Sequence, residues 1–511
     1  MTHFSKKTLF ASSLILFGTA AVAQNAKKGQ PAPQRNIIFI LSDDHRFDYM
    51  GFTQKVPWLE TPVMDSIAHN GVHLKNAFVS TALSSPSRAS ILTGMYAHQH
   101  QVVDNETPVT RPLTYFPEYL QQNGYQTAFF GKWHMGNSGD EKQKGFDHWE
   151  SFKGQGDYYN FTLNINGDRK SYGDSLYIAN VLTDHTIEWI EGNKDKPFFV
   201  YLSHKSVHDN FSAARKDIGK YKNEEINYPP SYPYKGSTPL LPSQKEGKPL
   251  SEIDWYGTDM VPDWVKSQRE SWHGVDYSYH GRRSFEEECR KYCETLTSLD
   301  SSIGELMKYL KEAGLDKSTL IVYMGDNGFC WGEHGLIDKR NAYEQSMRVP
   351  MLAYCPDLIQ PGTVVDEMVM NVDIAPTFLE VAGISQKPEQ IEGSSFLPLL
   401  KKEKIADWRE KIFYEYYWEY DFPHTPTTFA IRTDRYKYIR YHGIWDTNEF
   451  YDLENDPDEM HNLINSVEHR PMIKQMAADI FGWLEKTGGM QIPLKPTIKK
   501  REGDHRNPNS F

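Results

Sequence analysis

Cysteine is scarce in this chain, and its scarcity excludes a disulfide scaffold. The 511 residues contain only four cysteines, whereas small secreted domains without a large core carry many cysteines for their length. Cys289 and Cys293 stand four residues apart in a helical pattern, which is a poor geometry for a disulfide. We therefore expect all four cysteines, including Cys330 and Cys355, to be small buried apolar side chains.

Basic residues and long apolar runs are also in short supply. The 56 Lys and Arg residues face 68 Asp and Glu residues, for a net charge of −12, which argues against a general nucleic-acid-binding protein. An anionic substrate would need a local cluster of basic residues. Beyond residue 23 no run is long and apolar enough to span a membrane. Aromatic residues make up 13% of the chain, which excludes a disordered polyampholyte.

The N-terminus has the pattern of an export signal. Lys6 and Lys7 precede an apolar segment that ends in Ala21-Val22-Ala23, the form of a signal-peptidase site. A buried N-terminal helix is the alternative. We predict a signal peptide at residues 1–23, a linker at residues 24–35, and a mature protein in the periplasm or outside a bacterial cell, at its surface or released.

Short apolar runs alternate with helical patterns between residues 36 and 400. The runs suit strands buried on both faces of a sheet, and they lie at Asn36–Leu41, Gln126–Phe130, Pro197–Leu202 and Thr319–Met324. Helices are expected at 61–70, 113–123, 175–191 and 285–313. This alternation predicts an α/β catalytic domain with a large, mostly parallel sheet sandwiched by helices. Residues 205–283 break the pattern, and we expect them to form long loops around the site.

The character of the sequence changes after residue 400. Aromatic-rich, partly alternating segments predict a smaller antiparallel sheet in a C-terminal α+β subdomain, residues 401–511. Its strands are expected at 411–419, 428–432, 436–441 and 449–453, with a helix at 472–487 packed on them. The tail from Lys495 is basic and polar, and we expect it to be loosely held.

Polar residues follow four of the predicted strands of the large sheet. In an open parallel sheet the carboxyl ends of the strands share one edge, where ligands bind. The residues delivered there are Asp43-Asp44, Lys132-Trp133-His134, His204 and Asp326-Asn327. Their convergence predicts an active site at this edge.

The acidic and amide residues of this set are all hard oxygen donors. Asp43, Asp44, Asp326 and Asn327 offer three carboxylates and one amide, a combination that favours Ca²⁺, or Mg²⁺, over zinc or copper. Asp43-Asp44 alone would be explained by a helix cap or a solvated turn. The pairing with Asp326-Asn327 predicts a metal site.

The segment Ser84–Gly94, SSPSRASILTG, has the pattern of a turn that enters a helix. Pro86 suits the first helical turn, so Ser84 is expected at the helix N-terminus, where free backbone N–H groups favour an anion. Arg88 would lie on the same face and offer a bidentate clamp for an oxyanion. The simpler alternative is a serine-rich cap beside a surface arginine.

The run S-x-P-S-R-x-x-x-L-T-G within this segment resembles the signature of the type I sulfatases, in the alkaline-phosphatase-like superfamily. Further motifs of that family follow in its order. They are NIIFILSDDHR at 36–46, GKWHMG at 131–136, Ser203-His204, GDNG at 325–328 and GEHGLIDK at 332–339. Residues 205–283 match no motif of the family, so the sugar stays open.

The resemblance implies a catalytic apparatus. In the family the first position of the signature is Cys or Ser and is oxidised to Cα-formylglycine by a separate enzyme. Ser84 resembles the serine-type bacterial form, whose partner is a radical-type maturase. The modified residue 84 is expected to ligate the cation with the four oxygen donors and to attack sulfur.

The remaining roles are also implied by the resemblance, because sulfate-ester hydrolysis needs charge neutralisation and a proton for the leaving oxygen. Arg88, Lys132 and Lys339 are expected to clamp the sulfate charge. His204 is expected to protonate the departing alcohol, and His134 to assist sulfate release. Ordinary surface or loop positions are the alternative for these residues.

Three residues are weaker candidates for substrate binding. His208 follows His204 by four positions and is either a sugar contact or an ordinary loop histidine. Trp418 and His424 lie in the aromatic segment YYWEYDFPHT, which either stacks on a sugar ring or packs between the two domains.

The leading hypothesis is an exported, metal-dependent sulfuric ester hydrolase acting on sulfated carbohydrates of host or algal glycans. The region from YYWEY to YKYIRY resembles the N-acetylglucosamine-6-sulfatase type. A galactose or N-acetylgalactosamine O-sulfatase remains open, as does a phosphoryl or phosphonate hydrolase of the same superfamily that uses unmodified Ser84. A non-catalytic glycan-binding protein is disfavoured by the complete set of site residues. Exo or endo action and the oligomeric state stay open.

Overall fold

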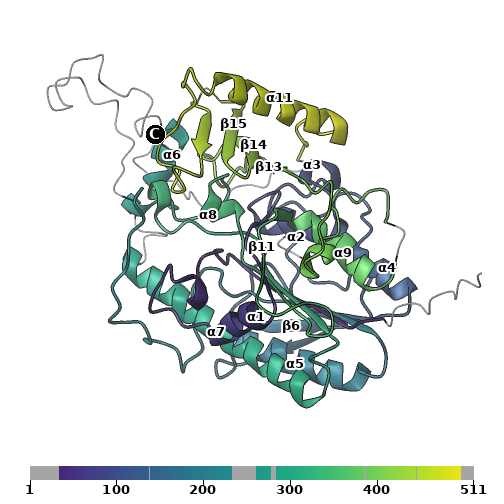
Figure 1. Ribbon diagram of the computed structural model, residues 1–511. Helices are drawn as coiled ribbons and strands as arrows, with labels where there is room; N and C mark the ends of the chain where they lie inside the picture. Colours follow the sequence, from purple (N-terminus) through teal and green to yellow (C-terminus); the bar gives the residue numbers. More distant parts are fainter. Residues whose placement is uncertain are drawn as a thin grey trace, which may run out of the picture. The chain divides into compact units, whose positions relative to one another are not determined.

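The computed structural model describes residues 34–136, 139–232, 261–277, 283–384, 387–444 and 446–495 (Figure 1). The predicted signal peptide, nearly all of the linker and the tail after residue 495 lie outside the described residues. In the part of the chain that is described, no helix is long and apolar enough to cross a membrane.

The four predicted strands form the middle of a ten-stranded sheet with the order β11-β2-β10-β9-β1-β8-β4-β5-β6-β7. Strand β1 (Ile37–Ser42) pairs in parallel with β8 (Phe198–Ser203) and β9 (Leu320–Gly325), and β4 (Gln126–Lys132) pairs in parallel with β8. Every residue of β1, β8 and β9 is buried. The continuous apolar runs therefore mark strands covered on both faces, as predicted.

The outer strands make the sheet mixed. On one side β10 (Met351–Tyr354) runs antiparallel to β9 and to β2 (Val72–Leu74), which pairs with β11 (Thr363–Val365). On the other side β5 (His148–Phe152) is parallel to β4, and β6 (Thr162–Ile165) and β7 (Asp168–Ser171) follow as antiparallel strands. Strands β3 (Ala77–Phe78) and β12 (Val369–Met370) form a separate pair.

Alternate residues of β1 belong to two different cores, as the pleat of a strand requires. Phe39 belongs to a core that holds residues of α2 (Ser84–Thr93), α4 (Phe116–Gln122) and α9 (Ile374–Val381). Ile38 and Ile40 belong to a core that holds residues of α1 (Pro62–Asn70), α5 (Ile178–Asn193) and α7 (Phe285–Glu312). Figure 1 shows α1, α5 and α7 grouped together, apart from α2, α4 and α9. The predicted sandwich is confirmed.

The shorter helices occupy the connections between these elements. They are α3 (Ala97–His100), α6 (Asp263–Arg269), α8 (Glu344–Met347) and α10 (Leu397–Leu400), with 3-10 turns η1 (Gly51–Thr53), η4 (Val275–Tyr277), η6 (Glu333–Gly335) and η7 (Asn371–Asp373). Helix α6 and turn η4 lie in the segment expected to be loops only, so this expectation was incomplete. Both are short elements, which hydrophobic periodicity does not reveal.

The C-terminal part forms the predicted antiparallel sheet. Its four strands lie in sequence order, β13 (Lys411–Tyr416), β14 (Thr427–Thr433), β15 (Tyr436–His442) and β16 (Glu449–Asp452). Helix α11 (Arg470–Thr487) packs on this sheet, where Trp483 stacks on Phe413 with ring centroids 4.8 Å apart. The boundary at residue 400 stays a prediction.

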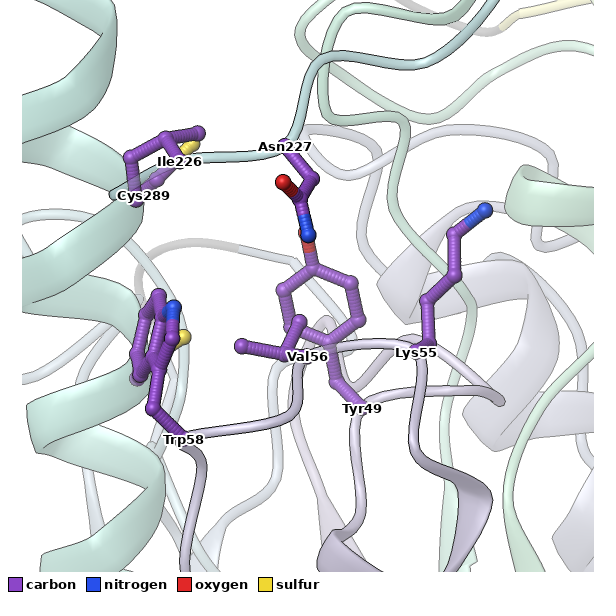
Figure 2. A pocket seen from close by; sticks show the side chains of 8 residues that line it. Tyr49, Lys55, Val56, Trp58, Ile226, Asn227 and Cys289 are labelled. Carbon is purple, nitrogen blue, oxygen red and sulfur yellow. The ribbon is translucent and has the colours of Figure 1, made fainter. Parts of the chain in front are cut away.

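All four cysteines are free and buried, as expected. Cys289 and Cys293 on α7 line a pocket of about 350 Å³ whose other walls include Tyr49, Val56 and Trp58 (Figure 2). Burial raises the pKa of both thiols, so neither is an activated nucleophile. This pocket shares no lining residue with the polar pocket described below.

Candidate active site

Helix α2 begins at Ser84, as the sequence predicts. Leu83 caps it in an extended conformation, and Gly94 ends it with a φ of 68°, a left-handed conformation that glycine adopts without strain. Ser84 and Arg88 are both buried on this helix, and Ser84 donates a hydrogen bond from Oγ to Oδ1 of Asp43 over 3.2 Å. The helix therefore places its N-terminal hydroxyl on the acidic pair that follows β1.

The predicted strand ends meet, as the parallel topology requires. The Asp44 backbone N–H donates to Oδ1 of Asp326 over 3.0 Å, and Nδ2 of Asn327 donates to Oδ1 of Asp44 over 2.7 Å. The Asp43 backbone N–H donates to the Ser206 carbonyl beyond β8, over 2.8 Å. These bonds join the ends of β1, β8 and β9 into one buried cluster.

Three cations accompany the three carboxylates. Arg88 Nε lies 3.0 Å from Oδ2 of Asp326, and its Nη1 donates to the Lys132 carbonyl at 2.8 Å and to Ser203 Oγ at 2.6 Å. Lys132 pairs with Asp43 and donates to Gln155 Oε1 at 2.5 Å. Lys339 pairs with Asp44. All three predicted anion-binding residues thus lie in the cluster.

The pKa values of Asp44 and Asp43 are shifted in opposite directions. Burial raises the pKa of Asp44 to about 6, the Lys339 ammonium opposes this, and the neighbouring Asp43 and Asp326 charges raise it further. Burial raises the pKa of Asp43 as well, but the charges of Lys132 and Arg88 hold it well below its usual value. The negative charge on Asp44 is therefore incompletely compensated by the protein, and a bound cation would relieve it.

The residues present fit a divalent cation. Asn327 Oδ1 is buried and has no hydrogen-bond partner among the described residues, which is costly unless a ligand satisfies it. Ligand atoms of Asp43, Asp44 and His208 lie within 4.8 Å of one another. The four predicted oxygen donors come together, and His208 joins them as a neighbour that the sequence did not assign to the metal.

Of the three predicted histidines, His134 and His204 are fully buried and His208 is partly exposed. His134 follows β4 and is buried, and its backbone carbonyl accepts a hydrogen bond from Ser85 Oγ. His204 is fully buried, neither ring nitrogen has a hydrogen-bond partner in the described part of the chain, and burial lowers its pKa to about 3. His208 lines the open pocket, with Nε2 at 3.7 Å from Oδ2 of Asp44. Of the two histidines after β8, His208 reaches the opening.

The tautomer of neutral His208 follows from its hydrogen bond. Its Nδ1 lies 2.6 Å from the Asp209 carbonyl, which only accepts, so Nδ1 carries a proton. Burial lowers the pKa of His208 well below its ordinary value. The neutral ring therefore presents the Nε2 lone pair toward Asp44.

A pocket of about 610 Å³ opens above Asp44, Lys339 and His208. Its outer wall is formed by residues that the sequence did not single out, namely Asn105, Glu106, Gln155, Asp209, Trp272, His273, Asp338, Arg340 and Phe422. The Arg340 guanidinium lies 3.5 Å from the centroid of the Phe422 ring. A second hollow of about 980 Å³ shares Gln155, His208, Asp209 and Trp272 with this pocket.

The three weaker substrate-binding residues stay predictions, and of them His208 lines the pocket. Trp418 is 41% exposed and donates from Nε1 to the Pro423 carbonyl over 3.2 Å. Neither Trp418 nor His424 lines either hollow, whereas Phe422 of the same segment does. A bridge between Glu419 and Phe422 turns the segment here, and that turn decides which ring faces the pocket. The richness in aromatics was the only signal in the sequence.

Comparison with known proteins places these features in a family. A family model described as Sulfatase matches residues 35–384, and a second, described as N-sulphoglucosamine sulphohydrolase, C-terminal, matches residues 332–485. The N-acetylglucosamine-6-O-sulfatase of Bacteroides thetaiotaomicron is 32% identical over 91% of this chain and 88% of its own length. The human N-acetylglucosamine-6-sulfatase is 30% identical over 75% of this chain and 67% of its own length.

Solved structures agree with the assignment to the sulfatase family. A protein in complex with its substrate D-glucosamine-2-N,6-O-disulfate superposes with a TM-score of 0.76 at 31% identity, over 90% of this chain and 99% of that one. The phosphonate monoester hydrolase of Agrobacterium radiobacter, at 19% identity and a TM-score of 0.67, shares the fold, over 89% of this chain and 96% of that one.

Proposed function

The chain belongs to the sulfatase family and is a sulfuric ester hydrolase, and on that premise we propose that it removes the 6-O-sulfate of N-acetylglucosamine in sulfated glycans. The observation that carries the proposal is the buried cluster in which Ser84, Asp43 and Asp326 meet Arg88. Relatives named for this sugar span most of the chain, and they support the choice of sugar.

Ser84 is the proposed nucleophile after oxidation to Cα-formylglycine by a radical-type maturase. The hydrated form of that group supplies a hydroxyl for attack on sulfur. The position suits this role because Ser84 begins α2, where backbone N–H groups and the helix dipole favour developing negative charge. Asp43, as the hydrogen-bond acceptor of Ser84 Oγ, orients the group.

Asp43, Asp44, Asp326 and Asn327 would hold the cation, which we propose to be Ca²⁺, with Mg²⁺ as the alternative. When bound, the cation neutralises charge on a sulfate oxygen. Lys339 lines the pocket and is positioned to bind the sulfate. Lys132 forms its ion pair with Asp43, whereas Lys339 forms one with Asp44. Arg88 lines neither hollow, and we assign it the positioning of Asp326.

His208 is the proposed donor of the proton to the departing sugar hydroxyl, in the role that the family resemblance suggested for His204. Its Nδ1 donates to the Asp209 carbonyl, so Nε2 of the neutral ring is free to take up a proton from water. The proton bound there faces the pocket, where the leaving oxygen must lie, and passes to that oxygen as the S–O bond breaks. His204 lines neither hollow. His134, whose carbonyl accepts from the neighbour of Ser84, keeps the proposed role in sulfate release.

Export to the periplasm or the cell surface is proposed from the N-terminal pattern Ala21-Val22-Ala23. The substrate would then be an extracellular or imported glycan. A cell fractionation that finds the full-length chain, with its N-terminus intact, in the cytoplasm would contradict this.

The function is tested with protein produced together with a radical-type maturase. Mass spectrometry of the peptide that carries Ser84 comes first, because formylglycine is lighter than serine by the mass of H₂. Matured protein is then assayed on a panel of 6-O-sulfated N-acetylglucosamine and of sulfated galactose and N-acetylgalactosamine isomers. Turnover confined to the 6-sulfated N-acetylglucosamine is expected. Turnover of a galactose or N-acetylgalactosamine isomer instead would overturn the choice of sugar. Hydrolysis of phosphonate esters by unmodified protein would overturn the assignment of formylglycine at position 84 as the nucleophile.

A further inference from the structure

The cations around the pocket are largely committed to protein carboxylates. Arg340 donates from Nε to Glu419 over 2.8 Å and from Nη1 to both oxygens of Asp338, at 3.0 and 2.9 Å. Lys339 pairs with Asp44. The charge of Arg340 is thus balanced by two acids that are themselves 5% exposed or less, and it offers little attraction to a further anion.

Lys205 is the one described cation whose side chain lines the second hollow. It is 3% exposed, and burial lowers the pKa of its ammonium. Its Nζ donates to the Asp209 carbonyl over 3.1 Å and lies 4.8 Å from the centroid of the Tyr158 ring. The nearby carboxylates of Asp43, Asp209 and Asp157 act in the opposite direction and raise this pKa, so the positive charge of Lys205 is already surrounded by negative charges.

Apart from the residues proposed to bind the sulfate, the side chains around the two hollows therefore carry a net negative charge. Apart from Asp44 and Lys339, the acidic residues among the described lining of the two hollows are Glu106, Asp157, Asp209 and Asp338, and Glu419 pairs with the lining residue Arg340. The lysine and arginine side chains are Lys205 and Arg340. A ligand group that carries a second negative charge would meet a repulsive field there, and like charges placed together are the usual means of excluding a wrong ligand.

The same wall offers apolar surface. The rings of Trp272 and Phe422 lie nearly parallel, at 15°, with centroids 6.5 Å apart, and both line the first pocket. Aromatic faces bind the apolar face of a sugar ring or a methyl group. An acetyl group suits such a surface, and a charged sulfo group does not.

We propose that this pocket selects sugars whose scissile sulfate is their only anionic group: a 2-N-acetyl rather than a 2-N-sulfo amino sugar, joined to a neutral rather than a uronic acid neighbour. The inference rests on the proposed function and narrows its substrate class. It separates this chain from the structurally similar protein that was solved with a 2-N,6-O-disulfated sugar.

The test compares matured enzyme on N-acetylglucosamine-6-O-sulfate and on glucosamine-2-N,6-O-disulfate, and then on disaccharides that join the first sugar to galactose or to a uronic acid. We expect kcat/KM to be at least ~10-fold higher for the singly charged member of each pair, and added salt to reduce the ratio by screening. Equal or faster turnover of the disulfated sugar overturns the inference while leaving the proposed function standing. Turnover of neither sugar overturns the proposed function itself.

A charge reversal identifies the origin of the selectivity. Asp157 lines the second hollow and is exposed, so Asp157→Lys should fold and should raise kcat/KM for the doubly charged substrates ~3-fold or more relative to the singly charged ones. Asp195→Lys is the matched control, because Asp195 is exposed and precedes β8, at the opposite edge of the sheet from His208. An equal shift in both variants would show a general charge effect and overturn the assignment to this pocket.

Discussion

Asn327 donates a hydrogen bond from Nδ2 to Oδ1 of Asp44 across 2.7 Å, although 283 positions separate the two residues. The bond orients the amide so that Oδ1 is the atom without a partner among the described residues. Because a buried carbonyl oxygen is costly to leave unpaired, this orientation fits the proposed cation, with Oδ1 as one of its ligands.

Metal removal should therefore destabilise the protein. We expect a chelator to lower the melting temperature and Ca²⁺ to restore it, since a ligand present at ~100 times its dissociation constant adds ~2.7 kcal/mol. The Asn327→Ala variant should show a much smaller response. Differential scanning calorimetry measures this, with Asn70→Ala as the control because Asn70 lies exposed at the end of α1. An unchanged melting temperature in chelator would contradict the metal site.

Replacement of Arg88 should cost stability as well as activity. Arg88→Ala leaves Asp326 and Asp43 buried with less compensation, and loss of one partner of a buried ion pair costs ~3–5 kcal/mol. Arg215→Ala provides the comparison, because Arg215 is 61% exposed where it pairs with Asp174 and exposed pairs contribute ~0–1 kcal/mol. Urea unfolding of both variants measures the two losses. Similar losses would show that Arg88 does not hold the cluster together.

The roles of His204 and His208, the two histidines after β8, can be distinguished with substrates whose leaving groups differ in their need for a proton. If His208 protonates the departing oxygen, His208→Ala should reduce kcat ~10²-fold or more for a sulfated sugar and far less for an aryl sulfate, whose phenolate leaves without a proton. His204→Ala should affect both substrates equally, and its main effect should be on stability, because it empties a buried site. A leaving-group dependence found in His204→Ala instead of His208→Ala would restore the role to His204.

Phe422 and Trp418 offer a matched pair in one segment. Phe422→Ala should raise KM for the sugar ~10-fold, because the ring lines the pocket and supports the Arg340 guanidinium. Trp418→Ala should leave KM unchanged, since that ring is outside both hollows. Steady-state kinetics with unchanged melting temperatures would establish the difference, and the reverse result would place the substrate on the other side of the segment.

Stability should depend on pH through His98. Burial lowers the pKa of His98, but its ion pair and hydrogen bond with Glu415, at 2.9 Å, outweigh burial and raise it above 6.5. Because the folded state holds the proton more tightly, the stabilisation is complete below the pKa of the unfolded chain and is lost as pH rises through the folded value.

The free energy of unfolding should therefore fall as pH rises above ~6.5, and urea titrations on both sides of that pH measure the slope. His98→Gln should flatten that part of the profile. His69→Gln, at the exposed end of α1, should leave it unchanged. A slope that persists in His98→Gln would assign the dependence to another group.

The central strands, the start of helix α2 at Ser84 and the meeting of the oxygen donors were all predictable from the sequence. Continuous apolar runs such as Asn36–Leu41 encode strands buried on both faces, and parallel topology brings their polar ends to one edge. Asp43, Asp326 and Lys132 therefore needed no knowledge of long-range packing, because each directly follows or ends its strand.

The residues that line the outer pocket could be identified only from the tertiary structure. His208 rather than His204 reaches the opening because the loop after β8 is fastened to β1, through hydrogen bonds from the Asp43 N–H to the Ser206 carbonyl and from the Val207 N–H to the Asp43 carbonyl. No periodicity encodes such bonds between distant segments.

The other residues of the outer pocket wall were likewise not predictable from the sequence. Gln155, Trp272, Arg340 and Phe422 come from four separate connections and meet only through packing. The sequence by itself determined where the proposed sulfate chemistry takes place, since that follows from strand ends and one helix start. Only the tertiary structure decided which loop side chains line the pocket proposed for the sugar, because the direction of a loop side chain depends on contacts far away in the chain.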